Sequence, residues 1–164
     1  HDALPIFDDR GRQFDGTGRN RNWWTAETDD RFMEKANTLI DQYDGYCPYA
    51  DACVNGLGTL GENIGDLAGL EISYAAWKLS LNGKQAPVIN GLTGDQRFFL
   101  AYARSYRGVI REELARAMLE GDSHAPNRFR VNGVVRNMDA WYAAFNIKPT
   151  DALYLPPEER VRLW

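Results

Sequence analysis

Long apolar runs are absent from this 164-residue sequence. No window approaches the roughly 20 apolar residues that span a bilayer, and no charged segment followed by an apolar one opens the chain. We therefore expect no membrane contact from this chain: either the protein is soluble or its targeting segment lies elsewhere. The 19 basic and 23 acidic residues give a formal charge of −4 without a single-sign tail. Nothing in this balance predicts a nucleic-acid partner.

Cysteine is also scarce, with two residues in the chain. Cys47 and Cys53 enclose Pro48 in a polar segment, so they form either a short-loop disulfide or two free thiols. Cysteine usage alone does not decide the compartment. The rest of the composition, 44% hydrophobic and 12% aromatic, favours one globular core and argues against disorder.

Apolar residues recur at helical spacing in the first part of the chain. Thr25 is a suitable N-cap, so we predict a first amphipathic helix over residues 25–43. Residues 44–58 collect Gly, Pro, Asn and Asp, the composition of an irregular connection. Thr59 and Glu62 match a Thr-x-x-Glu capping box, which predicts a second helix that begins at Thr59 and ends at Asn82-Gly83.

The second half of the chain repeats the helical pattern. Thr93 and Gln96 match the capping box again and begin a third helix, whose i, i+4 apolar stripe we assign mostly to the core. The stripe comprises Phe98, Tyr102, Tyr106, Ile110, Leu114 and Met118. Residues 121–136 show no helical period, so we predict a long ordered loop there. Asn137 is expected to cap a short helix, and Pro157 to begin a last turn.

Two carboxylates on the second predicted helix are the first candidates for chemistry. Glu62 and Asp66 lie four residues apart, which puts both on one helix face with Cβ atoms about 6 Å apart. Two carboxylates this close together favour the binding of a cation beside them. Gly65 and Gly69 each lower helix propensity by roughly 1 kcal/mol relative to alanine, unless another helix must approach there. The competing interpretation is structural, with Glu62 closing the capping box and Asp66 solvated.

A histidine and an arginine share the segment that is predicted as a loop. His124 is followed six residues later by Arg130. Such a pair can bind a developing oxyanion and a substrate carbonyl, and one donor placed at the developing charge lowers a barrier by roughly 3 to 4 kcal/mol. The competing interpretation is a surface histidine beside an arginine in an ordinary salt bridge.

Five segments, read in order, carry a family pattern. They are FDDRGRQFDG at 7–16, WW at 23–24, TLGENIGDLAGL at 59–70, HAPNRFRVNG at 124–133 and VRLW at 161–164. These segments resemble the neprilysin and endothelin-converting-enzyme family of zinc metallopeptidases, of the gluzincin type. Two departures occur, Gly65 in place of Ala and Ala68 where Gly is usual. The resemblance implies a mainly α fold, part of a thermolysin-like zinc metallopeptidase catalytic lobe, with few or no strands.

The resemblance also assigns roles to the four candidate residues. It implies that Glu62 is the third ligand of a catalytic zinc, and that Asp66 hydrogen-bonds a zinc-binding histidine, which preserves the tautomer and basicity of that ligand. It makes His124 a stabiliser of the tetrahedral intermediate and Arg130 a contact to the substrate backbone. The expected catalytic residues are therefore Asp66, His124 and Arg130, and the expected metal ligand is Glu62.

The other two zinc ligands are expected from an H-E-x-x-H helix, whose Glu acts as general base. In the family this motif immediately precedes the Phe-Asp-Asp found here at 7–9, but Asp2 replaces the base and Pro5 replaces the second histidine. We therefore expect the chain to be truncated just after the motif, to bind zinc weakly and to be inactive alone. HDALPI at 1–6 matches one reading frame of a common sequencing adapter. We interpret it as non-native, and residues 7–164 as the C-terminal portion of the peptidase catalytic domain.

Two classes of function remain. As an enzyme, the complete protein is a metalloendopeptidase that hydrolyses peptide substrates with zinc-bound water, using one zinc ion and the missing N-terminal part of the same chain. As a binding module, the segment around His124 and Arg130 grips a peptide without cleaving it, which the loss of H-E-x-x-H favours. A metal-free hydrolase using Glu62 and Asp66 is disfavoured, because nothing supplies the opposed environments that such an acid and base require. The resemblance implies an extracellular, periplasmic or membrane-anchored location.

Overall fold

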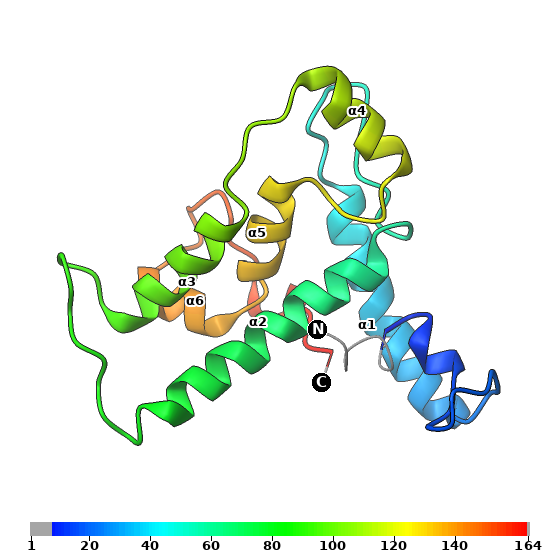
Figure 1. Ribbon diagram of the computed structural model, residues 1–164, viewed down its shortest axis with the longest axis horizontal. Helices are drawn as coiled ribbons and strands as arrows, with labels where there is room; N and C mark the ends of the chain where they lie inside the picture. The colour runs from blue at the N-terminus through cyan, green and yellow to red at the C-terminus, as the bar shows by residue number, and fades with distance from the viewer. Residues whose placement is uncertain (1–7, 164) are drawn as a thin grey trace.

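Helices make up most of the computed structural model, which describes residues 8–163 (Figure 1). The α-helices are α1 (Ala26–Asp44), α2 (Leu60–Ser80), α3 (Gly94–Ser105), α4 (Glu112–Gly121), α5 (Asn127–Val135) and α6 (Asp139–Phe145), and the 3-10 helices are η2 (Gly11–Gln13) and η3 (Pro157–Glu159). Extended pairing within the described residues is limited to isolated bridges. The prediction of a mainly α fold is confirmed. The interpretation of residues 1–6 as non-native lies outside the described range.

α1 follows the predicted pattern closely. The hydroxyl of Thr25 accepts a hydrogen bond from the backbone N–H of Thr28 at 3.1 Å, as an N-cap should. One face of the helix is buried at helical spacing, and its residues are Phe32, Ala36, Leu39 and Tyr43. This face forms one wall of the core.

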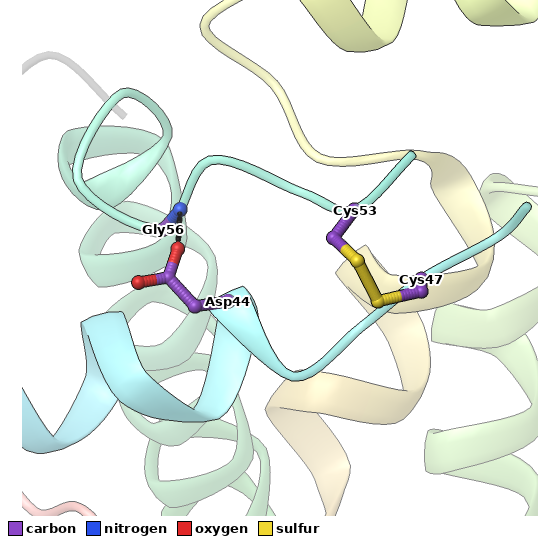
Figure 2. The surroundings of a disulfide bond; sticks show 4 residues. All are labelled: Asp44, Cys47, Cys53 and Gly56. Carbon is purple, nitrogen blue, oxygen red and sulfur yellow. Dashed lines mark hydrogen bonds between the residues drawn. A yellow bond between two sulfur atoms is a disulfide. The ribbon is translucent and has the colours of Figure 1, made fainter. Parts of the chain in front are cut away.

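The connection from α1 to α2 contains a disulfide between Cys47 and Cys53 (Figure 2). The structure thus decides between the two states that the sequence left open. The Asp44 carboxylate at the end of α1 accepts a hydrogen bond from the Gly56 backbone N–H at 2.6 Å. A Cβ at Gly56 would clash with the backbone of Ile40, so the chain passes α1 more closely than other residues allow.

α2 crosses the middle of the molecule, between α1 and the pair formed by α3 and α6 (Figure 1). The capping box predicted for its start is wrong, because the Thr59 hydroxyl donates to the Asn55 carbonyl at 2.9 Å and accepts from the Asn63 amide at 2.9 Å. Glu62 is thereby left available to another partner. The first half of α2 is buried, whereas Ile72 is exposed in its second half.

The long third helix predicted after Thr93 is divided in the structure. Its capping box is confirmed, since Thr93 and Gln96 exchange both hydrogen bonds. The helix ends at Ser105, residues 106–111 are non-helical, and α4 follows. Gly108 and the β-branched pair after it have low helix propensity, which accounts for the break. The assignment of the stripe to the core is wrong at its last three members, Ile110, Leu114 and Met118, which are exposed.

α5 overturns the prediction of a continuous loop over 121–136. It begins after Pro126 and buries Phe129, Val134 and Val135. It packs against α2, α1 and α3. Gly133 allows α5 to approach α1 closely, because a Cβ at this position would lie 2.8 Å from the hydroxyl oxygen of Tyr43. Tertiary packing therefore specifies a helix that the apolar period did not reveal.

The C-terminal segment contributes Val161 and Leu163 to the core. Asn137 is not the expected N-cap; it is buried, and its side chain donates to the Gly133 carbonyl and accepts from the Val161 backbone N–H, both at 2.8 Å. α6 follows with Met138 before its first residue. Pro157 begins η3, as predicted.

Candidate functional site

The two carboxylates predicted on one helix face do lie on one face of α2, and they have different partners. Asp66 forms a two-point ion pair with Arg130 of α5: Nε lies 2.6 Å from Oδ2 and Nη2 lies 2.7 Å from Oδ1. Both side chains are largely buried, with 7% of Asp66 and 14% of Arg130 exposed. Burial alone would lower the pKa of Arg130, but hydrogen bonding to Asp66 and its charge raise it overall. Arg130 is thus a fixed cation.

Tyrosines enclose this ion pair. The Tyr106 hydroxyl donates to Asp66 Oδ1 at 3.1 Å, and the guanidinium of Arg130 lies 5.0 Å from the centre of the Tyr106 ring. The Tyr102 hydroxyl donates to the Arg130 carbonyl at 2.9 Å. Burial and the charge of Asp66 raise the pKa values of both phenols, which therefore stay protonated as donors. The sequence analysis assigned both tyrosines to the core stripe and did not predict their contacts with the Asp66–Arg130 ion pair. Their i, i+4 spacing, which puts both on one helix face, was the available signal.

His124 lies between two carboxylates. Its Nε2 is 2.9 Å from Oε2 of Glu62, and its Nδ1 is 2.8 Å from Oδ1 of Asp122. The same Asp122 oxygen accepts the backbone N–H of His124 at 2.9 Å. These hydrogen bonds lower the pKa of Asp122. Asp122 therefore orients the imidazole, and the Asp-x-His pattern was the signal for it that the sequence analysis did not use.

All four predicted residues meet at one place. Glu62 Oε2 contacts His124 and also lies 3.7 Å from Nη2 of Arg130, while Asp66 holds the other side of that guanidinium. The histidine partner expected for Asp66 is not among the described residues, in which Asp66 binds Arg130 and Tyr106 instead. The individual roles of the four residues stay predictions.

A cavity of about 300 Å³ adjoins this cluster. Its lining includes His124 and Arg130, Pro48 and Tyr49 of the α1–α2 connection, and Met118 of α4. The site is therefore a mostly apolar hollow with a cation and an imidazole at its edge, a surface suited to an extended polar chain with apolar side groups.

The residues between 8 and 163 do not complete a zinc site. Within that range no three His, Cys, Asp or Glu side chains lie together as metal ligands. A catalytic zinc requires three protein ligands, and Glu62 supplies one carboxylate already contacted by His124 and Arg130. No helix of the described chain is long and apolar enough to cross a bilayer.

The helical fold matches part of a zinc metalloprotease of known structure. The crystal structure of the Mycobacterium tuberculosis zinc metalloprotease Zmp1 in complex with inhibitor superimposes on 98% of this chain and 25% of that chain, with a TM-score of 0.95 and 46% identity. Residues 1–161 match the model of Peptidase family M13. The chain belongs to this family, the family of the neprilysins and endothelin-converting enzymes.

Relatives from distant organisms match the chain from end to end. The neutral endopeptidase of Lactobacillus helveticus is 36% identical over 164 residues, and endothelin-converting enzyme 1 of Bos taurus is 33% identical over 167 residues. Both alignments include 100% of this chain, but only 24% and 22% of the respective relative. The chain thus spans about a quarter of the length of these relatives.

Proposed function

We propose that this chain supplies part of the active site of a neprilysin-like zinc metalloendopeptidase, which hydrolyses peptide bonds in peptide substrates. The observation that carries the proposal is the convergence of Glu62, His124 and Arg130, from α2, the segment after α4, and α5, beside one apolar cavity. Membership of family M13 supports the reaction class.

Each residue has a task that follows from its contacts. Glu62 is the carboxylate that we assign to zinc, and zinc in such enzymes activates water and polarises the scissile carbonyl. Asp66 occupies Nε and Nη2 of Arg130 and orients the guanidinium, so that it can donate to a substrate carbonyl. Asp122 fixes the His124 ring through Nδ1 and so directs Nε2 as a donor to the developing oxyanion. One such donor contributes roughly 3 to 4 kcal/mol.

The chain by itself is proposed to be inactive. The sequence contains no H-E-x-x-H, and its only histidine besides His124 is His1. In this proposal, two zinc ligands and the general base come from residues outside this chain. The alternative is a non-catalytic module that binds a peptide against the cavity, and the absence of H-E-x-x-H from this sequence favours it. The extracellular, periplasmic or membrane-anchored location is part of the same proposal.

The test is a Glu62→Gln variant of the complete protein encoded by the native gene. We expect the wild-type protein to contain one zinc ion and to show chelator-sensitive peptide cleavage, and the variant to lose both, because an amide is a much weaker zinc ligand than a carboxylate. Glu34→Gln, an exposed carboxylate on α1, is the matched control and should change neither. Zinc-independent binding of peptides without cleavage would favour the module. A native gene that encodes HDALPI before Phe7 would refute the non-native origin of residues 1–6.

A further inference from the structure

The Cys47–Cys53 disulfide closes a small hairpin on the surface. Within it, the backbone N–H groups of Tyr49 and Ala52 donate to each other's carbonyls at 3.4 and 3.2 Å. Both cysteines are exposed to solvent. Figure 2 shows the disulfide lying beyond the Asp44–Gly56 hydrogen bond, which fastens the base of the same connection. The disulfide is accessible to a reductant, and its loss would remove the one covalent link across the hairpin, leaving backbone hydrogen bonds such as that from the Val54 N–H to the Tyr46 carbonyl at 2.9 Å.

Arg116 of α4 contacts this hairpin. The guanidinium of Arg116 lies 3.9 Å from the centre of the Tyr49 ring, and its Nη1 lies 3.1 Å from Oδ1 of Asp51. α4 has no buried residue, and among its side chains Leu119 is the one that packs against the core cluster. Besides Leu119, the contacts of Arg116 with residues 49 and 51, which the disulfide brackets, therefore help to position α4.

α4 in turn directly precedes the residue that orients the imidazole of His124. The helix ends at Gly121, and the next residue, Asp122, binds both the backbone N–H and Nδ1 of His124. Tyr49 of the hairpin and His124 also line the same cavity. A continuous set of contacts thus runs from the disulfide through Arg116 and α4 to His124.

We propose that the Cys47–Cys53 disulfide is a redox-sensitive clamp that holds α4 and His124 in place. Its reduction by a dithiol lowers the rate of peptide cleavage. A thiolate of the dithiol attacks one cysteine sulfur, the S–S bond breaks, and a mixed disulfide forms. The second thiolate then closes the oxidised dithiol ring and releases the first cysteine. Two electrons and two protons pass to Cys47 and Cys53. The hairpin then no longer fixes Tyr49 and Asp51 against Arg116.

The effect on cleavage rests on the proposed peptidase function, whereas the clamp itself does not. The experiment therefore compares the complete oxidised protein with the protein after dithiothreitol treatment, by two readouts. Hydrogen exchange over residues 112–124 is expected to rise severalfold on reduction. The kcat/KM for a peptide is expected to fall roughly tenfold, because a small displacement of a positioning group has effects of this order. Reoxidation should restore both values.

Three variants make the result specific. Cys47→Ser/Cys53→Ser should resemble the reduced protein and not respond to the dithiol; any response would measure removal of zinc by the reagent. Arg116→Ala should raise exchange over 112–124 with the disulfide intact. Arg31→Ala is its matched control, since Arg31 forms an exposed i, i+4 pair with Glu27 at 2.6 Å on α1, and it should leave that exchange unchanged.

The possible outcomes separate the two proposals. Equal exchange over 112–124 in the oxidised and reduced protein would overturn the clamp, whatever the cleavage rate. A change in exchange without a change in kcat/KM would overturn its effect on catalysis. A complete protein that cleaves no peptide in either state would refute the proposed function, while the exchange measurement would still decide whether the clamp exists.

Discussion

The site joins two regions of the molecule that are stabilised in different ways. The scaffold, defined as α1, α2 and α5, contributes most of the buried core residues and contains Glu62, Asp66 and Arg130. The α4 arm, residues 106–124, buries none of its residues and contains His124. Figure 1 shows α4 standing apart from the helices around α2. Apolar packing therefore positions the carboxylates and the arginine, whereas polar contacts with Glu62 and Asp122 position the imidazole.

This difference has a functional consequence. Side chains on packed helices are hard to displace, because displacing them requires the free energy of opening the core. A group held by exposed contacts can be displaced at much lower cost in free energy. The histidine is thus the member of the site whose position can be regulated, and substitutions in the two regions should differ accordingly.

The largest expected effect follows from breaking the buried ion pair in the scaffold. Asp66→Ala leaves the Arg130 guanidinium buried without its carboxylate, which should cost about 3 to 5 kcal/mol of opening free energy in α2 and α5. Native-state hydrogen exchange on the complete protein measures this quantity. Asp66→Leu/Arg130→Met should recover much of the loss, because no unpaired charge remains. A single variant as stable as the wild type would contradict the role of the pair.

A second comparison tests packing directly. Leu67 of α2 is 1% exposed and Leu114 of the α4 arm is 56% exposed. Leu67→Ala should therefore cost about 2 to 4 kcal/mol through lost burial and the cavity left behind. Leu114→Ala should change stability by less than about 0.5 kcal/mol. Thermal unfolding of the complete protein compares the two, and similar losses would show that the α4 arm is covered in the complete protein.

Glycine substitutions compare the packed scaffold with the exposed α4 arm again, with smaller expected effects. A Cβ at Gly133 would lie 2.8 and 2.9 Å from the hydroxyl oxygen and Cζ of Tyr43, so Gly133→Ala should cost about 1 to 3 kcal/mol by overpacking α5 against α1. Gly121, at the end of α4, has open space at this position. Gly121→Ala should stabilise the arm by up to about 1 kcal/mol. Hydrogen exchange in α5 and α4, respectively, measures each change.

The smallest effect is a pH dependence in the α4 arm. The hydrogen bond from Arg116 lowers the pKa of Asp51 below its unfolded value of about 4. The contribution of this ion pair is therefore complete above about pH 4 and is lost as the pH falls through the lowered pKa. Protection of residues 112–121 against exchange, relative to the intrinsic amide exchange rate at each pH, should therefore decrease in that acidic range. Asp51→Asn should show the faster exchange at all pH values, and a pH profile identical to wild type would exclude Asp51 as the titrating group.

Sequence reasoning succeeded where the information is local. Thr25 and the Thr93–Gln96 pair begin helices because their side chains bond backbone N–H groups within three residues, so the sequence alone predicts them. The i, i+4 spacing put Glu62 and Asp66 on one face. The family pattern selected His124 and Arg130, and the structure brings these four side chains together.

Tertiary structure decided what depends on distant partners. α5 is helical because its apolar residues meet α1 and α2, and the break after Ser105 leaves Tyr106 in contact with Asp66, 40 residues away. Arg130 lies 64 residues from the same carboxylate. The sequence by itself determined the helical class, the starts of α1, α2 and α3, and the candidate residues, since these follow from local patterns along the chain. The partners of each residue, and the dependence of His124 on α4, required the fold, because no periodicity encodes which side chains meet across such separations.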